Sequence, residues 1–263
     1  MLKNTARSRR PRAAATASLA AAAVLGLALA GCGQDSTSPQ EARGRADTRV
    51  QAKAARTAGT VDCARAKCIA LTFDAGPGPH TPQLLDILKE KKVHATFFLL
   101  GSKHVDTYPD IVRRAAAEGH EIANHTWTHR RLDQLKPDEI RSELGRTQRA
   151  VEALTGRAPT LMRPPQGRTN DEVTAVSKEL GLSQVLWSAT AKDYATTDSA
   201  LIHKRILDQA SRDGIILLHD IYDGTVPAVP GIIDELTERG YTFVTVPQLL
   251  APGTPQPGTL YRP

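Results

Sequence analysis

From residue 61 onward, short runs of apolar and β-branched residues alternate with longer stretches in which apolar residues recur every three or four positions. The short runs predict β-strands, and the amphipathic stretches predict helices. The expected strands, seven in all, are Ile69–Phe73, Ala95–Leu99, Glu121–Asn124, Thr160–Met162, Gln184–Trp187, Ile215–Leu218 and Tyr241–Val244. Helical patterns separate them over residues 81–92, 110–118, 137–155, 171–180, 199–212 and 229–239.

The first helical pattern carries clear start signals. Thr81 stands where an N-cap is expected, Pro82 follows at the first helical position, and Leu84, Leu85 and Leu88 share one face. Repeated alternation of strand and helix predicts an α/β fold with a parallel sheet. Seven units within residues 61–250 favour a barrel, and an open doubly wound sheet is the alternative.

The first residues of the chain form a different pattern. Five basic residues precede an apolar run from Leu19 to Ala30, and Leu29-Ala30-Gly31 stands before Cys32. This predicts a bacterial lipoprotein signal over residues 1–31, with Cys32 lipidated after cleavage. An uncleaved membrane anchor is the alternative, although the run is shorter than the ~20 residues that a spanning helix needs. The "SRRPR" stretch points weakly to twin-arginine rather than general secretory export.

Removal of this segment changes the interpretation of charge. The whole chain has a formal net charge of +6, and loss of five Lys and Arg leaves +1. The sequence therefore predicts no nucleic-acid partner. Residues 32–60 are polar and small, typical of a flexible tether to a domain held at the outer face of the cell membrane by its lipid alone. The tail "APGTPQPGTLYRP", residues 251–263, is rich in Pro and Gly and is expected to be disordered or extended. No oligomeric state is predicted.

Two cysteines, Cys63 and Cys68, lie just before the first strand. In an exported protein this spacing favours a small disulfide loop, because a metal site would need two more thiolates or nearby histidines.

Polar residues follow five of the expected strands. They are Asp74 and the clusters "NHTWTH", "RPPQG", "SATAKDY" and "HD", which begin at residues 124, 163, 188 and 219. Singly, each has a structural interpretation: Asp74 as a turn cap, Arg163 as an ion-pair partner, His219 as a core histidine. Together they fall at the carboxyl ends of parallel strands, where barrels build active sites.

These residue types suit metal-assisted hydrolysis. Two neutral imidazoles, His125 and His129, can hold a divalent ion that polarises a carbonyl and acidifies a bound water. A carboxylate, Asp74, can take the proton of that water, and His219 can protonate the leaving group.

With these residues in place, the chain resembles the polysaccharide deacetylases of the fourth carbohydrate esterase family. The resemblance runs from Ile69 to Leu250 and includes "TPQLLDILKEKKVHATFFLLG" and "GYTFVTVPQLL". It implies a distorted (β/α)7 barrel and removal of acetyl groups from chitin, peptidoglycan or acetylxylan. It also implies a divalent metal, most often Zn²⁺, with Co²⁺ or Mn²⁺ as alternatives.

The motifs of that family match this chain residue by residue, with two departures. The match makes Asp74 the catalytic base, His125 and His129 metal ligands, Arg163 the residue that orients the base, and His219 the general acid. Asp193 would tune that acid, while Tyr194 and Leu217 would contact substrate. The departures are Ala75, where the family has an Asp ligand, and Gln166, where it has an aromatic residue; the backbone N–H of Gln166 could still serve an oxyanion.

Three hypotheses follow. The first is a deacetylase of N-acetylglucosamine polymers that holds its metal weakly, because losing an anionic ligand weakens the hold on a cation. The second is a glycan-binding protein without activity, and the third is an O-acetyl esterase of the acetylxylan type.

Overall fold

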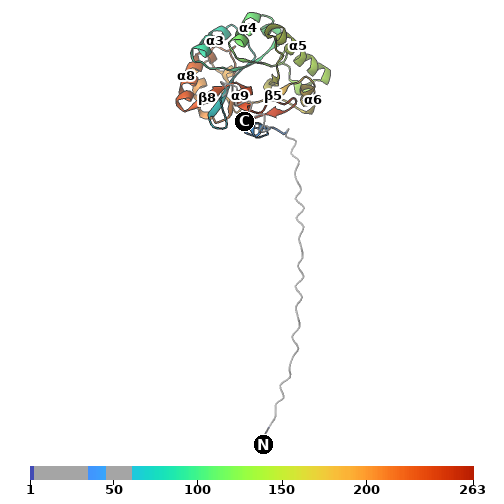
Figure 1. Cartoon of the computed structure of the whole chain (residues 1–263), viewed down its shortest axis with the longest axis vertical. Helices are drawn as coiled ribbons and strands as arrows, with labels where there is room; N and C mark the ends of the chain where they lie inside the picture. The colour runs from blue at the N-terminus through green and yellow to red at the C-terminus, as the bar shows by residue number, and fades with distance from the viewer. Residues whose placement is uncertain (3–34, 46–60) are drawn as a thin grey trace. The chain divides into compact units, whose positions relative to one another are not determined.

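The computed structural model describes residues 1–2, 35–45 and 61–263. The chain divides into two units, residues 1–33 and 34–263, and the second contains the folded domain (Figure 1). Apart from residues 1–2, the expected signal segment and Cys32 lie outside the described residues. Within the described part of the chain, no helix is both long and apolar enough to cross a membrane.

A curled sheet of parallel strands forms the centre of the domain. Its strands follow the spatial order β6-β7-β1-β2-β3-β4-β5-β9, and β8 pairs with the first half of β1. Every pairing is parallel, as the sequence predicts, and the architecture is the expected distorted (β/α)7 barrel type. The strands are β1 (Lys67–Asp74), β2 (Thr96–Leu99), β3 (Glu121–Asn124), β4 (Leu161–Met162), β5 (Ser183–Val185), β6 (Ala189–Thr190), β7 (Gly214–Leu218), β8 (Tyr241–Val244) and β9 (Leu260–Tyr261).

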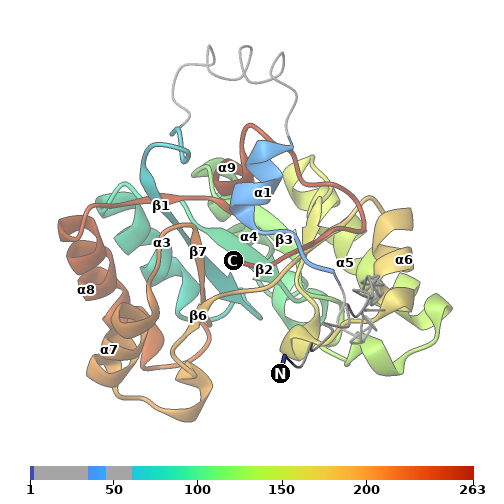
Figure 2. The ribbon, with the colours of Figure 1, turned by 90° about the horizontal axis from the view of Figure 1, so that it is seen from below.

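Helices cover the outer face of this sheet, as the views along and across the domain show (Figures 1 and 2). They are α3 (Thr81–Glu90), α4 (Pro109–Ala117), α5 (Pro137–Thr155), α6 (Asp171–Glu179), α7 (Ser199–Gln209), α8 (Thr225–Glu238) and α9 (Val246–Leu250), with α1 (Pro39–Gly44) before the first strand. The helix expected to begin at Val229 therefore starts a turn earlier, and the one expected to reach Arg212 ends at Gln209.

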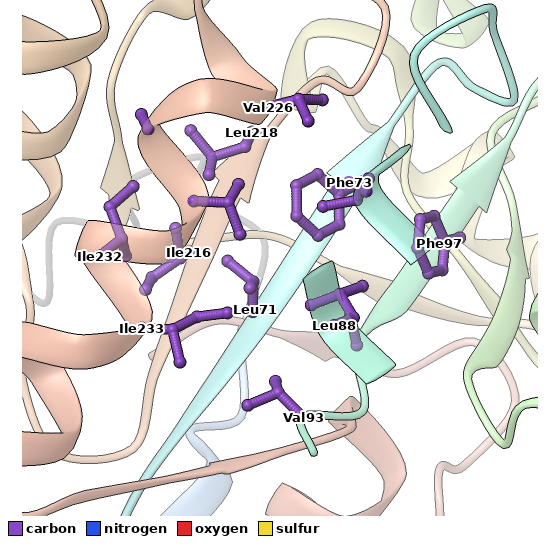
Figure 3. Close-up of a cluster of buried hydrophobic side chains, with 14 of the residues drawn as sticks. Leu71, Phe73, Leu88, Val93, Phe97, Ile216, Leu218, Val226, Ile232 and Ile233 are labelled. Carbon is purple, nitrogen blue, oxygen red and sulfur yellow. The ribbon is translucent and has the colours of Figure 1, made fainter. Parts of the chain in front are cut away.

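The main core lies between β1, β2, β7 and the helices α3 and α8. Figure 3 shows Leu71 and Phe73 of β1 between the apolar faces of these elements. The rings of Phe73 and Phe97 stack with centroids 5.4 Å apart. Burying a side chain of this size contributes ~2 kcal/mol. This packing fixes β1 in the sheet centre and so fixes the place of Asp74 at its end.

Thr81 is not the N-cap of α3, which corrects the sequence prediction. His80 occupies the cap position without a capping bond, and Thr81 is the first helical residue. The Thr81 hydroxyl instead accepts the Gly78 N–H at 2.8 Å and donates to the carboxylate of Asp220. The Thr81 hydroxyl therefore binds the buried carboxylate of Asp220, which follows β7, and does not cap the helix.

The C-terminal tail is ordered where it meets the sheet. Leu260 and Tyr261 form β9, which pairs with β5, and the Leu186 N–H donates to the Tyr261 carbonyl at 2.9 Å. The sequence did not predict β9 or the two-residue strand β6, because runs this short carry no periodic signal.

Part of the expected tether also packs on the domain. Residues 39–44 form α1, which lies beside α9 (Figure 2). Arg43 donates to the Leu249 carbonyl at 2.8 Å and pairs with Asp213 at 2.6 Å. Thr37 bridges to Tyr261 of β9. The rest of the expected tether, residues 46–60, lies outside the described residues.

The predicted disulfide between Cys63 and Cys68 is present. Both cysteines are fully buried in a small apolar cluster, so the bridge anchors the chain where β1 begins.

Candidate active site

Four strand ends of the sheet bring polar side chains to one place. Asp74 is the last residue of β1, and the pairing of Phe73 with Leu218 sets His219 beside it. The His125 N–H donates to the Leu99 carbonyl at 2.9 Å, and the Arg163 N–H donates to the Asn124 carbonyl at 2.9 Å. Because these bonds extend the parallel pairing past the strand ends, the residues after β3 and β4 face the same end of the barrel as Asp74.

Asp74 is bonded to a buried arginine. The Arg163 guanidinium donates to Asp74 Oδ1 at 2.6 Å and to the Thr72 hydroxyl at 2.8 Å, and it also reaches the Val185 carbonyl at 3.0 Å. Asp74 is 2 % exposed and Arg163 is fully buried. A charge-assisted bond of this kind holds the carboxylate in one orientation.

His125 and His129 lie next to each other across the loop after β3. Their ring centroids are 4.9 Å apart, and His125 Nε2 is 3.8 Å from Asp74 Oδ2. The Nδ1 atom of His125 hydrogen-bonds the Arg163 carbonyl at 2.8 Å, so this nitrogen carries the proton and Nε2 keeps its lone pair. Burial lowers the pKa of His125 to about 4, despite the opposing effect of Asp74, and burial likewise lowers the pKa of His129. Both rings are therefore neutral at neutral pH, which is the form that binds metals.

His219 is held by Asp193 from a different loop. Asp193 Oδ1 lies 2.8 Å from His219 Nδ1, while Oδ2 accepts the His219 N–H at 2.7 Å and the Thr225 hydroxyl at 2.7 Å. Burial on its own lowers the pKa of His219, but the hydrogen bond and charge of Asp193 outweigh it, so the pKa is raised above its ordinary value. The imidazole thus holds a proton on the nitrogen facing Asp193 and presents Nε2 to the site.

Two tyrosines flank this histidine. Tyr194, 57 % exposed, stands edge-on to His219 with centroids 6.2 Å apart, and Tyr222 does so at 5.4 Å. Tyr222 was missed by the sequence analysis, although its place three residues after His219 was a usable signal. Leu217 is buried on β7 beside Thr72.

Several residues of the site loops have left-handed backbone conformations. They are Ala75 (φ 64°), Thr126 (φ 77°), His129 (φ 63°), Gln166 (φ 58°) and Lys192 (φ 49°). Non-glycine residues pay a conformational cost in this region and adopt it only where surrounding contacts enforce it. Their gathering in the loops after β1, β3, β4 and β6 indicates that the site geometry is imposed by the fold.

Glu143 of α5 supplies such contacts, and the sequence analysis missed it. Its carboxylate accepts the Trp127 N–H at 3.1 Å, the Thr128 N–H at 2.8 Å and the Thr128 hydroxyl at 2.7 Å. The signal was an acidic residue beside Leu144 on the buried face of an amphipathic helix. Glu143 therefore fixes the loop that carries both histidines.

Position 75, where the family motif has an Asp ligand, carries Ala75, so this position gives His125 and His129 no third ligand. Ala75 is 7 % exposed, and its N–H donates to the Phe98 carbonyl at 3.0 Å. Across residues 35–45 and 61–263, no three His, Cys, Asp or Glu side chains are grouped as a complete metal site. The donors present are two imidazoles, which suit Zn²⁺ and similar ions, with Asp74 close by.

Comparison with known proteins agrees with this arrangement. The family model for polysaccharide deacetylases matches residues 62–185. The chain is 43 % identical over 184 residues to the peptidoglycan-N-acetylmuramic acid deacetylase PdaC of Bacillus subtilis, covering 70 % of this chain and 38 % of PdaC. It therefore spans about two fifths of the length of that relative. It is 37 % identical over 204 residues to a chitooligosaccharide deacetylase of Bradyrhizobium, covering 72 % of this chain and 93 % of that protein.

Solved structures show the same fold. A structure described as T48 deacetylase with substrate superposes with a TM-score of 0.73 at 39 % identity, covering 76 % of this chain and 99 % of that one. BA3943 of Bacillus anthracis, described as a pseudoenzyme of the fourth carbohydrate esterase family, gives a TM-score of 0.68 at 27 % identity, covering 75 % and 70 %. By its sequence relatives and its fold, this chain belongs to the polysaccharide deacetylase family.

Proposed function

We propose that this chain is a metal-dependent hydrolase that removes acetyl groups from polysaccharide containing N-acetylglucosamine, such as peptidoglycan or a chitin-like chain. The observation that carries the proposal is the pair of buried contacts at one end of the barrel, Arg163 with Asp74 and Asp193 with His219. One contact orients a base and the other an acid, which are the two groups that amide hydrolysis needs. The relatives named as peptidoglycan and chitooligosaccharide deacetylases support the substrate class.

In this proposal, Asp74 takes a proton from the attacking water while Arg163 holds the carboxylate in place. The water oxygen bonds to the acetyl carbon, and the backbone N–H of Gln166 stabilises the charge on the carbonyl oxygen. His219, as the imidazolium that Asp193 favours, then donates its Nε2 proton to the amide nitrogen as the carbon–nitrogen bond breaks and keeps the proton on Nδ1. Acetate and the free amine of the sugar are the products.

His125 and His129 would hold the metal. When bound, a divalent ion supplies polarisation of the carbonyl and a lowered pKa of water. The neutral state of both rings and the bond from His125 Nδ1 to the Arg163 carbonyl fit this role. With Ala75 in place of an acidic ligand, we expect a loosely held ion, Zn²⁺ or a similar divalent metal.

Tyr194 and Leu217 would contact the sugar and its acetyl group. Tyr194 is exposed beside His219, as a ring lining a glycan groove must be. Leu217 lies on β7, which ends one residue before His219, and this place suits contact with a small apolar methyl group.

A glycan-binding role without catalysis is the second candidate, and Ala75 favours it. A structural neighbour of the chain is described as a pseudoenzyme, and a mutant of that neighbour is described as having restored activity. The fold is therefore also found in a protein described as a pseudoenzyme.

We also propose an extracytoplasmic location at the outer face of the cell membrane, with the lipid on Cys32 as the anchor. The support is the basic and apolar pattern of residues 1–31 and the polymeric substrate itself, which lies outside the cytoplasm.

Acetate release by a fragment lacking residues 1–32 tests the proposal. This fragment keeps residues 35–45, whose α1 packs on the domain. Chito-oligosaccharides, peptidoglycan and acetylxylan should be offered with chelator and then with added zinc. We expect release from the first two that chelator abolishes and zinc restores.

His219→Ala and His125→Ala serve as controls, and each should abolish release. Binding of these glycans without release at saturating zinc would favour the second candidate, and release from acetylxylan alone would identify an O-acetyl esterase.

A further inference from the structure

A polar pocket of about 340 Å³ opens beside the candidate active site. Its walls come from three strand ends and are Gln166, Gly167, Leu186, Trp187 and Arg262. Gln166 and Gly167 follow β4, Leu186 and Trp187 follow β5, and Arg262 follows β9. The volume lies within the range of pockets that take small ligands.

The side chain of Arg163 links a wall of the pocket, Trp187, to the proposed base, Asp74. The guanidinium carbon of Arg163 lies 5.6 Å from the Trp187 ring, and the same guanidinium is bonded to Asp74. Gly167 (φ 67°) also lies against Trp187, because a Cβ at this position would come within 3.0 Å of the ring. Only glycine allows this contact without strain, so the indole that lines the pocket packs closely on the loop after β4.

Arg262 gives the pocket its charge. It is exposed, and no carboxylate among the described residues pairs with its guanidinium. None of the other lining residues is ionisable. The backbone around it is fixed, since the Arg262 N–H donates to the Thr37 carbonyl at 3.1 Å and Tyr261 pairs with β5. A free guanidinium on a fixed backbone is suited to bidentate binding of a carboxylate.

Gln166 is the second polar side chain that lines the pocket. Its exposed amide offers two donors and an acceptor, and the proposed mechanism assigns its backbone N–H to the carbonyl oxygen of the acetyl group. A ligand that reaches the base and this pocket together must therefore be a glycan with hydroxyl or amide groups near the reacting sugar and a negative charge beyond them.

We propose that this pocket binds a carboxylate carried by a sugar next to the one that is deacetylated, with Arg262 as the residue that selects it. The proposal rests on the proposed function and narrows it to acidic glycans, of which peptidoglycan is one. The carboxylate can be on the sugar itself, as in muramic acid, or on a peptide attached to that sugar.

Binding and turnover of three probes test this. They are chitobiose, the disaccharide of N-acetylglucosamine with N-acetylmuramic acid, and the same disaccharide bearing a short peptide. Affinity is measured by calorimetry or NMR titration, and acetate release is measured in parallel. We expect the wild-type fragment to bind a carboxylated probe at least fivefold more tightly than chitobiose, with a preference that falls as salt is raised.

Arg262→Gln should remove most of that preference, and Arg113→Gln is the matched control. Arg113 is an exposed arginine of α4 paired with Asp110, away from the pocket, so its variant should keep the wild-type preference. The two carboxylated probes distinguish a sugar carboxylate from a peptide carboxylate.

An unchanged preference in Arg262→Gln, a wild-type preference for chitobiose, or binding of no probe would each overturn the proposal. Absence of acetate release with the preference intact would instead count against the proposed catalysis and leave the pocket assignment standing.

Discussion

Asp193 Oδ1 and His219 Nδ1 lie 2.8 Å apart, and Asp193 is 1 % exposed. The other oxygen of the same carboxylate is bonded to the His219 backbone and to Thr225. One buried acid thus fixes both the ring and the main chain of the proposed general acid, and it raises the pKa of that ring.

Asp193→Asn should therefore lower the pKa of His219, because the negative charge that favours the imidazolium is removed and burial, which lowers the pKa, remains. A general acid must be protonated, so the alkaline limb of the activity profile should move to lower pH. We expect a loss of ~10²-fold or more at neutral pH. NMR titration of the His219 ring with the pH profile checks this. A limb that stays in place would show that another group is the acid.

Ala75→Asp should tighten zinc binding by at least tenfold, because it restores the anionic ligand expected at this position from the family motif. The backbone favours the change, since Ala75 has φ 64° and Asp tolerates this region better than Ala. Ala75→Asn is the control of equal shape without charge, and it should gain much less. Zinc affinity is measured by competition with a chromophoric chelator. An unchanged affinity in Ala75→Asp would mean that another group already occupies the third position.

Glu143→Ala should weaken zinc binding by ~10- to 100-fold, because the loop of His125 and His129 loses the acceptor for two N–H groups and a hydroxyl. Glu143→Gln keeps one carbonyl acceptor and should lose less. Glu152→Ala removes an exposed acid from the same helix and should leave affinity unchanged. Metal affinity and the melting temperature should be measured together, since equal losses in Glu143→Ala and Glu152→Ala would contradict the role of Glu143.

His120 should make the domain sensitive to acid. The ring is 7 % exposed, and its Nδ1 accepts the Ala95 N–H at 3.1 Å. Burial and, to a smaller extent, the neighbouring His94 lower the pKa of His120 to about 4. The unfolded chain therefore binds this proton more readily, so the stability due to the neutral ring is present above pH 6.5 and is lost as pH falls toward 4.

The expected loss between pH 7 and pH 4 is on the order of 2 to 3 kcal/mol. His120→Asn keeps an acceptor for Ala95 but cannot be protonated, so its unfolding free energy should vary less with pH over this interval. Urea unfolding at several pH values measures the difference between the two slopes. Identical slopes would place the acid sensitivity elsewhere.

The sequence predicted most of the parallel sheet because its strands are apolar and its helices are amphipathic. The strands are apolar because both faces of the sheet are covered, and each helix buries only one face. The same reasoning gathered Asp74, Arg163 and His219 at the carboxyl ends of strands, where the structure has them. The sequence-based reasoning was wrong where the role of a residue depends on a single hydrogen bond to a residue far away in the chain. Thr81 read as a cap because its competing partner, Asp220, is 139 residues away.

The sequence predicted a disordered or extended tail and a flexible tether, but not that parts of both pair with or pack on the domain, and the reason is related. Neither Thr37 nor Tyr261 belongs to a periodic run, and each is ordered only because the other, together with β5, gives its backbone partners. The sequence analysis missed Glu143 because the role of a buried carboxylate on a helix can be assigned only when the N–H groups that donate to it are known.

Arg163 joins parts of the sheet that are not neighbours. It directly follows β4, yet its guanidinium bonds Thr72 and Asp74 of β1 and the Val185 carbonyl of β5. Two strands lie between β1 and β4 in the sheet order. These buried bonds link strands that do not pair with each other, so one cation contributes to the curvature of the sheet and also orients the base. A substitution at this position therefore changes the shape of the barrel along with its chemistry, and the activity lost in such a variant measures both together.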